Sequence, residues 1–281
     1  MDAQQILNKA RAEGWALGAF NAGNLEILKA VVAAAQSQNS PVIAETSSGE
    51  AEYFGMKNFL TVAENFGLPV LTNFDHGPGL EECQNAIEAG YKMIHFDGSG
   101  LPYEENLKIT KVLVAQAHQK GILVEGEIDR IGGESKAHEE LAESLLATVN
   151  YTDPQKAADF VAQTGVDILA VFVGNLHGVY KTPKKLDLER LRMVRSLTNC
   201  PFSLHGGSTL LEADIRAAIV LGVVKINVNT ELRLAFRQTL ENVLRGSDEA
   251  AVYKIMPPVM AAIQKVVEEK IKLFGSSGKL L

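Results

Sequence analysis

Short apolar segments alternate with amphipathic segments along the whole chain, and this alternation predicts its architecture. The apolar segments are rich in Val, Ile, Leu and Phe, as expected of strands that are buried on both faces. They lie at Ala16–Phe20, Pro41–Glu45, Pro69–Phe74, Lys92–Phe96, Ile122–Glu127, Asp167–Val173, Pro201–Leu204 and Val223–Val228. The pattern therefore predicts eight buried strands.

Helical periodicity fills the intervals between these strands. The clearest helices are predicted at Leu25–Gln38, Gly79–Ala89, Pro102–Gln119, Pro154–Thr164, Leu186–Ser196 and Leu211–Leu221. Glycines that precede the next strand, at Gly90, Gly121, Gly165 and Gly222, predict left-handed residues at the helix ends. Asp153 before Pro154 predicts a helix N-cap with proline in the first turn.

Alternating strands and helices imply parallel pairing with right-handed crossovers. An open, doubly wound sheet is the competing architecture. The count of eight, and the polar residues that follow the strands, favour a closed (β/α)8 TIM barrel, an α/β fold, as a single domain over residues 1–281. The chain continues into a C-terminal helical extension, predicted as a helix at Glu231–Leu244 and a helical arm at about 250–275.

One connection, at about 128–150, is unusually long and strongly charged. Long connections inside compact domains are uncommon and often form functional lids. This segment is therefore predicted to be a mobile loop over the site, with a solvated charged insertion as the alternative.

Composition narrows the function classes. The 281 residues carry a net charge of −7 and a pI near 5.5, which argues against a broad nucleic-acid-binding surface but leaves room for a small anionic substrate. Cys83 and Cys200 form no disulfide framework. The N-terminus lacks the pattern of a signal peptide, and no apolar run approaches the roughly 20 residues that span a membrane. We therefore expect a cytoplasmic protein that does not contact membranes.

Candidate chemistry lies where the strands end, because barrel enzymes build their sites at the C-terminal ends of the strands. Three of the six histidines, His76, His177 and His205, fall there, and each is followed by glycine. Three neutral imidazoles in one mouth predict a zinc or other transition-metal site with an open position for substrate. A lone histidine would more often be a hydrogen-bonded core residue, which is the interpretation given to His95, while His118 is predicted to be exposed and His138 to lie on the long loop.

Acids and small donors accompany these histidines. Asp75 is a candidate general base or an orienting partner of a histidine, and Asp97 and Glu127 are candidates for a second metal position. Each could instead be a carboxylate that accepts bonds from backbone amides at a turn. The late strand ends carry Gly178, Gly206, Gly207, Ser208, Asn227 and Thr230, which predict a phosphate site, with ordinary turn chemistry as the alternative.

Together these motifs resemble the class II, zinc-dependent ketose-bisphosphate aldolases, over nearly the whole chain. The resemblance covers Gly18-Ala19-Phe20-Asn21, Asn24-Leu25-Glu26, Asp75-His76-Gly77, Asp97-Gly98-Ser99, Glu125-Gly126-Glu127, Gly132-Gly133, Thr164-Gly165-Val166-Asp167, His177-Gly178-Val179-Tyr180, Leu204-His205-Gly206-Gly207-Ser208 and Lys225-Ile226-Asn227. The fructose-bisphosphate and tagatose-bisphosphate branches are both similar.

The resemblance implies metal-dependent, reversible aldol cleavage of a phosphorylated ketose to dihydroxyacetone phosphate and an aldehyde. It implies Zn2+ as the cofactor, with a second metal or a monovalent cation as an addition, a small-molecule sugar phosphate as the ligand and a homodimer or homotetramer. The implied zinc ligands are His76, His177 and His205, with Asp97 and Glu127 near an alternative metal position. Asp75 is the implied acid/base, and Asn21 and Ser47 are implied to line the mouth as polar residues. Arg233 is implied to bind the distal phosphate in a neighbouring subunit's site. The implied phosphate cradle consists of Gly178, Gly206, Ser208, Asn227 and Thr230.

Two positions depart from the family pattern. Ser135 stands where the family's loop glutamate is expected, so Glu134 is the first candidate for the proton shuttle, ahead of Glu139 and Glu140. Asn229 stands where fructose-specific relatives tend to have aspartate and tagatose-specific relatives alanine, which leaves the sugar's stereochemistry open. The alternatives are a catalytically weak aldolase-like subunit that binds a ligand or a partner, and a metal-dependent hydrolase on the same barrel.

Overall fold

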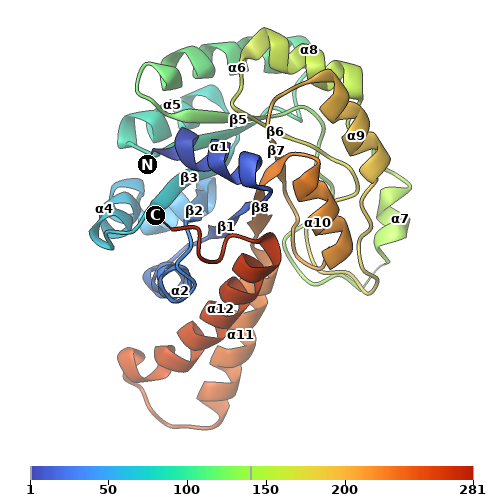
Figure 1. Ribbon diagram of the computed structural model, residues 1–281. Helices are drawn as coiled ribbons and strands as arrows, with labels where there is room; N and C mark the ends of the chain where they lie inside the picture. The colour runs from blue at the N-terminus through green and yellow to red at the C-terminus, as the bar shows by residue number, and fades with distance from the viewer. Residues whose placement is uncertain (1, 140, 281) are drawn as a thin grey trace.

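Eight parallel strands close into a barrel in the computed structural model, which describes residues 2–139 and 141–280. The strands follow one another around the barrel in chain order, and β8 pairs with β1 (Figure 1). They are β1 (Leu17–Asn21), β2 (Val42–Ser47), β3 (Val70–Gly77), β4 (Met93–Asp97), β5 (Leu123–Glu127), β6 (Ile168–Ala170), β7 (Phe202–Leu204) and β8 (Val223–Val228). The predicted closed barrel is confirmed, and the open sheet is excluded.

Most of the helices cover the outside of the barrel, while the first closes its N-terminal end and the last two project from it (Figure 1). The helices are α1 (Ala3–Glu13), α2 (Leu25–Ser37), α3 (Ser48–Phe54), α4 (Met56–Asn65), α5 (Leu80–Ala89), α6 (Tyr103–His118), α7 (Ala142–Leu146), α8 (Pro154–Thr164), α9 (Leu188–Leu197), α10 (Glu212–Val220), α11 (Thr230–Arg245) and α12 (Val252–Phe274). Asp153 caps α8 by accepting from the Lys156 amide, and Gly90 and Gly165 end α5 and α8 in the left-handed conformation, as predicted.

One predicted strand is shorter than expected. The apolar run at Asp167–Val173 pairs only over Ile168–Ala170. The Asn175 side chain then accepts from the Val173 amide and donates to the Val171 carbonyl, so these groups are satisfied outside the sheet. Val171 and Val173 stay buried against the core, which is why hydrophobicity alone overestimates the strand.

The helix α1 closes the N-terminal end of the barrel. Its first turn is fixed by a capping box between Asp2 and Gln5, and its apolar face packs with Trp15 on the first residues of the strands, such as Leu17. Because this end is filled, the C-terminal ends of the strands form the open mouth of the barrel.

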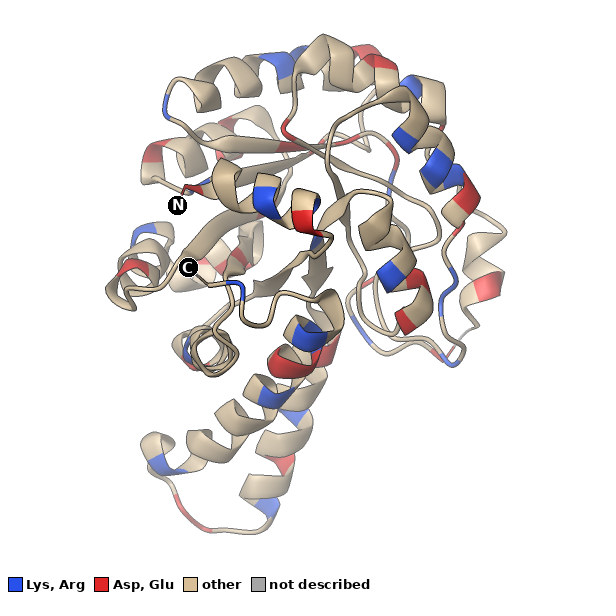
Figure 2. Ribbon diagram, in the orientation of Figure 1, with Lys and Arg blue, Asp and Glu red and all other residues tan. Residues whose placement is uncertain are grey.

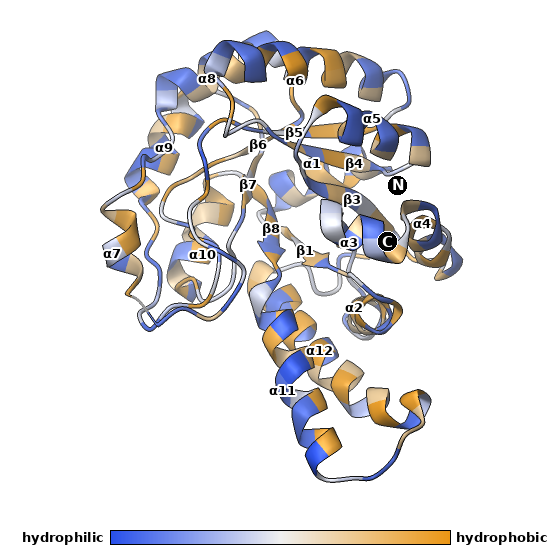
Figure 3. Ribbon diagram, turned by 180° about the vertical axis from the view of Figure 1, so that it is seen from behind, coloured by the Kyte–Doolittle hydropathy of each residue, from blue (hydrophilic) through white to orange (hydrophobic). Residues whose placement is uncertain are grey.

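The C-terminal extension is a helical hairpin of α11 and α12 that projects from the barrel (Figure 1). Residues at helical spacing along α12, from Met256 to Phe274, are buried against α2 and α11, and the orange segments of this helix in Figure 3 follow the same pattern. Val252 and Tyr253 at the start of α12 are strongly exposed. That the arm serves oligomer contacts stays a prediction.

The long connection after β5 contains α7 and is tied to the segment that follows β6. The His177 amide donates to the Gly132 carbonyl, and Ala137 forms a bridge with Val179. Ile131 and Ala142 pack with Phe172 in a small apolar cluster of their own. The connection therefore lies beside the mouth; Glu140, one of its candidate acids, lies outside the described residues.

In the view of Figure 2, basic and acidic residues are interspersed along the outer helices. Across the described residues, no helix combines the length and the apolar composition needed to cross a bilayer.

Candidate active site

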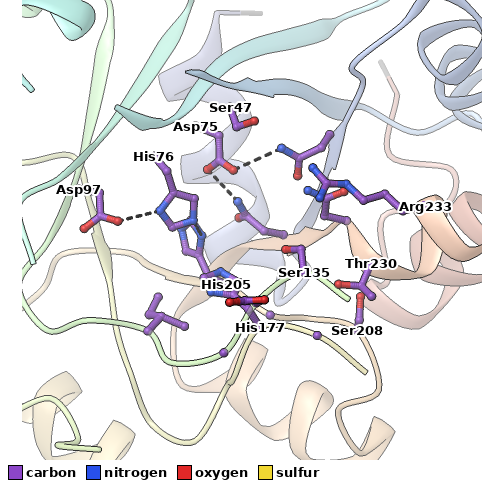
Figure 4. A pocket seen from close by; sticks show the side chains of 18 of the residues that line it. Ser47, Asp75, His76, Asp97, Ser135, His177, His205, Ser208, Thr230 and Arg233 are labelled. Carbon is purple, nitrogen blue, oxygen red and sulfur yellow. Dashed lines mark hydrogen bonds and ion pairs between the residues drawn. The ribbon is translucent and has the colours of Figure 1, made fainter. Parts of the chain in front are cut away.

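A cavity of about 390 Å³ opens at the C-terminal end of the barrel (Figure 4). Most of the residues that the sequence singled out line it: Asn21, Ser47, Asp75, His76, Asp97, Glu127, Glu134, His177, Gly178, His205, Gly206, Ser208, Asn227, Asn229, Thr230 and Arg233. Two further candidates, Gly207 and Glu139, do not line it. Arg130, Ile131, Gly133 and Ser135 of the long connection complete the lining. Residues far apart in sequence thus meet in one place.

Three imidazole rings converge in this cavity. The centroid of the His76 ring lies 4.6 Å from that of His205 and 5.3 Å from that of His177. The register of β3 shifts between Phe74 and Gly77, and His76 itself has a left-handed backbone with φ of 49°. This uncommon conformation turns the ring from the strand end toward the other two histidines, and such local strain is typical of functional sites.

Carboxylates behind two of the rings determine which nitrogen atoms face each other. The His205 Nε2 lies 2.7 Å from Glu125 Oε1, and the His76 Nδ1 lies 3.0 Å from Asp97 Oδ2. Each carboxylate requires the ring nitrogen beside it to carry the hydrogen, which leaves the other nitrogen of each neutral ring with a lone pair. Those two nitrogens, His76 Nε2 and His205 Nδ1, lie 3.0 Å apart.

Two lone pairs at that distance repel each other unless a proton or a cation lies between them. Burial and the neighbouring His76 and His205 hold the pKa of His177 well below its ordinary value, and burial with His95 also lowers the pKa of His205. The rings of His177 and His205 are therefore neutral and available as ligands. Burial lowers the pKa of His76, but Asp75 and Asp97 more than offset it, so this pKa is raised. The donor set fits a zinc ion.

Asp75 lies beside the three rings and is ionised. Its carboxylate accepts from Asn227 Nδ2 at 3.1 Å and from Asn21 Nδ2 at 3.4 Å (Figure 4). Burial raises the pKa of Asp75, but the charge of His76, the bond to His95 and the charge of Lys225 outweigh burial and hold this pKa well below its usual range. A buried carboxylate kept in its basic form can accept a proton from a bound substrate.

His95 is a hydrogen-bonded core residue of β4, as predicted, and it touches this polar cluster from the barrel interior. It is fully buried, with Nδ1 3.4 Å from Asp75 Oδ1 and Nε2 3.2 Å from Glu127 Oε2. Neither His95 Nε2 nor Glu127 Oε2 has a hydrogen bond of good geometry. The side chains of His76, Asp97 and Glu127 also lie close enough together to share a cation.

The opposite side of the cavity is lined by small donors. Gly178 and Gly206 have positive φ angles of 94° and 63°, and a Cβ at Gly206 would overlap the Leu176 carbonyl, so glycine is required there. Thr230 is the first residue of α11, a helix of 16 residues whose free amides face this side. Backbone amides at such a helix N-terminus, together with Ser208, suit a phosphate group.

A third wall is held by a carboxylate that the sequence did not single out. Oε2 of Glu50 accepts from the Ser47 amide and hydroxyl and from Asn21 Nδ2, and Oε1 accepts from Arg233 Nη2 at 2.9 Å. Arg233 thus lines the cavity of its own chain. Its predicted reach into a neighbouring subunit stays a prediction, as does the effect of Asn229 on stereochemistry.

Glu134 and Ser135 both reach the cavity from the long connection. The Glu134 carboxylate is exposed and pairs with Lys136 at 2.6 Å, which lowers its pKa. Glu139 is almost fully exposed and pairs with Lys181. Of the described candidate acids on this connection, Glu134 alone lines the cavity.

Beneath the mouth, buried charges fill the barrel interior. Lys225 Nζ lies 2.7 Å from Glu125 Oε2 and 3.4 Å from Glu45 Oε2, and all three side chains are fully buried. The sequence carried a signal for them, because each is a charged residue within a predicted buried strand. This layer holds Glu125 against His205 and so connects the barrel core to the candidate ligands.

A parallel barrel whose mouth gathers histidines, an ionised aspartate and phosphate-type donors is characteristic of barrel enzymes that act on small anionic substrates. The model of the family described as "Fructose-bisphosphate aldolase class-II" matches residues 1–279. The chain belongs to this family and is an aldolase, a carbon–carbon lyase.

Individual relatives agree with this assignment. The chain is 38% identical to fructose-bisphosphate aldolase of Geobacillus stearothermophilus and 36% identical to that of Staphylococcus aureus, each over 98% of this chain and 97% of the relative. The crystal structure of the YdjI aldolase from Escherichia coli K12 superposes with a TM-score of 0.84 at 34% identity, covering 100% of this chain and 99% of that one.

Proposed function

We propose that this aldolase uses zinc to cleave a phosphorylated ketose reversibly into dihydroxyacetone phosphate and an aldehyde. One observation carries the proposal: His76 Nε2 and His205 Nδ1 face each other at 3.0 Å while carboxylates hold the opposite nitrogens. His177 is the third proposed ligand. When bound, zinc supplies a Lewis acid that polarises the ketose carbonyl and stabilises the negative charge that cleavage creates.

Asp75 is the proposed base for the C4 hydroxyl. Its low pKa keeps it ionised, and Asn21 and Asn227 hold its two oxygens, so it is oriented before substrate arrives. Loss of the hydroxyl proton to Asp75 accompanies cleavage of the C3–C4 bond. Glu134, whose carboxylate is exposed to solvent, is the proposed shuttle that takes up a proton from water and delivers it to the carbon released by that cleavage.

The phosphate of the dihydroxyacetone phosphate half is proposed to bind Gly178, Gly206, Ser208, Asn227 and Thr230, which we call the phosphate cradle. This places the phosphate at the N-terminus of α11 and the rest of the ketose across the histidines. The cavity of about 390 Å³ is in the range of small-molecule sites. The family and the names of its relatives support an aldolase rather than a phosphate-releasing hydrolase.

The test is a coupled assay for dihydroxyacetone phosphate released from a panel of phosphorylated ketoses. The panel includes fructose and tagatose bisphosphates, 6-deoxy and 6-sulfo analogues and a deoxyketogluconate phosphate, each with and without chelator. Release from at least one ketose, lost with chelator and restored by zinc, is the expected result. Release of inorganic phosphate without a triose product would instead identify a hydrolase.

A further inference from the structure

A buried lysine that the proposed chemistry does not use lies beneath the phosphate cradle. The Nζ of Lys184 donates to the carbonyl oxygens of Leu176 at 2.7 Å, Gly178 at 3.1 Å and Gly206 at 2.6 Å. The side chain is fully buried, and it forms no ion pair with a carboxylate among residues 2–139 and 141–280. The groups that accept hydrogen bonds from its Nζ are therefore all carbonyl oxygens.

The number of bonds indicates the form of this amino group. An ammonium has three N–H groups, and the three carbonyls satisfy all of them, whereas a neutral amine would leave one carbonyl unpaired. Burial lowers the pKa of Lys184 to about 7, and Glu231 opposes that shift. Glu231 itself pairs with Lys270 at 2.7 Å, so these two charges largely cancel.

The three carbonyls belong to the two loops that carry candidate zinc ligands. Leu176 and Gly178 flank His177, and Gly206 follows His205. Converging carbonyl oxygens repel one another, and in proteins such cages are the usual environment of a potassium ion or another monovalent cation. In this chain a covalently attached cation occupies the centre of the cage.

We propose that the Lys184 ammonium is a built-in monovalent cation, which replaces a free ion in the carbonyl cage and positions the phosphate cradle. The inference rests on the proposed function, because the cradle is the proposed phosphate site. Lys184 is a positioning residue: it holds Gly178 and Gly206 in place and adds a positive charge beneath them. The wild-type enzyme therefore needs no added potassium, sodium or ammonium.

The decisive variant is Lys184→Ala, which removes the cation and leaves the cage open. At pH 6.5, with tetramethylammonium chloride as the inert salt, we expect kcat/KM for the phosphorylated ketose to fall at least tenfold, mainly through KM. Adding 100 mM potassium or ammonium chloride at constant ionic strength should raise kcat/KM of Lys184→Ala at least fivefold. The wild-type protein should change less than twofold between these salts.

A second readout is independent of catalysis. Cation binding to the folded Lys184→Ala protein should raise its melting temperature by about 2–4 °C in potassium or ammonium relative to tetramethylammonium. The wild-type melting temperature should not depend on which salt is used. This readout tests the cage even if no ketose on the panel is cleaved, so failure of the proposed function and failure of this inference are distinguishable.

Two further variants complete the design. Lys184→Met fills the cage with an apolar chain and should be impaired without rescue, and Lys185→Ala, an exposed neighbour that loses the same charge, should behave as wild type. A wild-type enzyme that requires added potassium would overturn the proposal. So would a Lys184→Ala protein that gains neither activity nor stability from any of the small cations, or that fails to fold in all of these salts.

Discussion

Individual side chains in the mouth owe their chemistry to the charges that touch them. Asp75 and Glu45 are both buried carboxylates of adjacent strands, yet their pKa values move in opposite directions. Asp75 lies among histidines and stays ionised. Burial and the nearby Asp75 raise the pKa of Glu45 more than Lys225 and Asn73 lower it, so this pKa rises to about 8.

Asp75→Asn should abolish the proposed proton transfer while keeping the shape of the side chain. We expect kcat to fall by about a thousandfold, since general base catalysis typically contributes two to four orders of magnitude. Metal analysis of the purified variant should show zinc content like that of the wild type, which separates loss of the base from loss of the metal. Retention of more than a tenth of the activity would remove Asp75 from this role.

Glu50→Gln should change which substrates are preferred. The Glu50 carboxylate accepts hydrogen bonds from Asn21, Ser47 and Arg233, so these donors are already occupied. Because the carboxylate is also negatively charged, this wall is poorly suited to a second phosphate group. Removing its charge should raise the ratio of kcat/KM for a ketose bisphosphate to that for the 1-phosphate by about tenfold. The exposed Glu52→Gln on the same helix α3 is the matched control, and an equal ratio in both variants would contradict this role of Glu50.

Glu45 should make stability depend on pH. Between about pH 4.5 and pH 8 the unfolded chain releases the Glu45 proton while the folded protein keeps it, so the free energy of unfolding decreases as the pH rises. Glu45→Gln should flatten this dependence in urea denaturation of the metal-free protein at pH 5.5 and pH 8. The exposed Glu64→Gln should leave the slope unchanged, and equal slopes in wild type and Glu45→Gln would refute the argument.

At the scale of elements, the strand ends position the site and the long connection after β5 completes it. The strands bring rigid ligands, whereas the connection brings Glu134 and Ser135 on a segment tied to the loop after β6. The His138 amide donates to the Val179 carbonyl next to the phosphate cradle. Movement of this connection would therefore move acid and cradle together.

Replacement of the connection's proposed acid tests that arrangement. Glu134→Gln should lower kcat about a hundredfold with little change in KM, because it removes a proton donor without removing a substrate contact. Ser135→Ala and Glu139→Gln should each retain most of the activity. A variant Glu134→Gln with normal kcat would show that another group returns the proton.

At the scale of the whole molecule, barrel closure joins the proposed ligands, which come from the end of β3 and from the loops that follow β6 and β7. Zinc bound to His76, His177 and His205 would link these three segments, which stabilises the folded state because the unfolded chain has no such site. Removing the metal with chelator should lower the melting temperature by about 5 °C or more. His177→Ala should abolish that difference, and an unchanged melting temperature in the wild type would argue against a tightly bound metal at this position.

The sequence alone determined the order and kind of the elements, because continuous apolar runs for strands and period-3.6 burial for helices are local patterns that each element must satisfy. It also indicated that His76, His177, His205 and Asp75 belong to the site, since polar residues directly after apolar runs fall at the mouth of any parallel barrel. The assignment to the aldolases follows from motifs of the same kind.

Contacts between distant residues were decided only by the tertiary structure. The roles of Lys184, Glu50 and His95 depend on partners up to 183 residues away along the chain, as for Glu50 and Arg233. A lysine in a loop looks solvated in sequence, and only the closure of two loops around it surrounds its ammonium with carbonyls. Burial and charge balance belong to the packed molecule, so no local pattern encodes them.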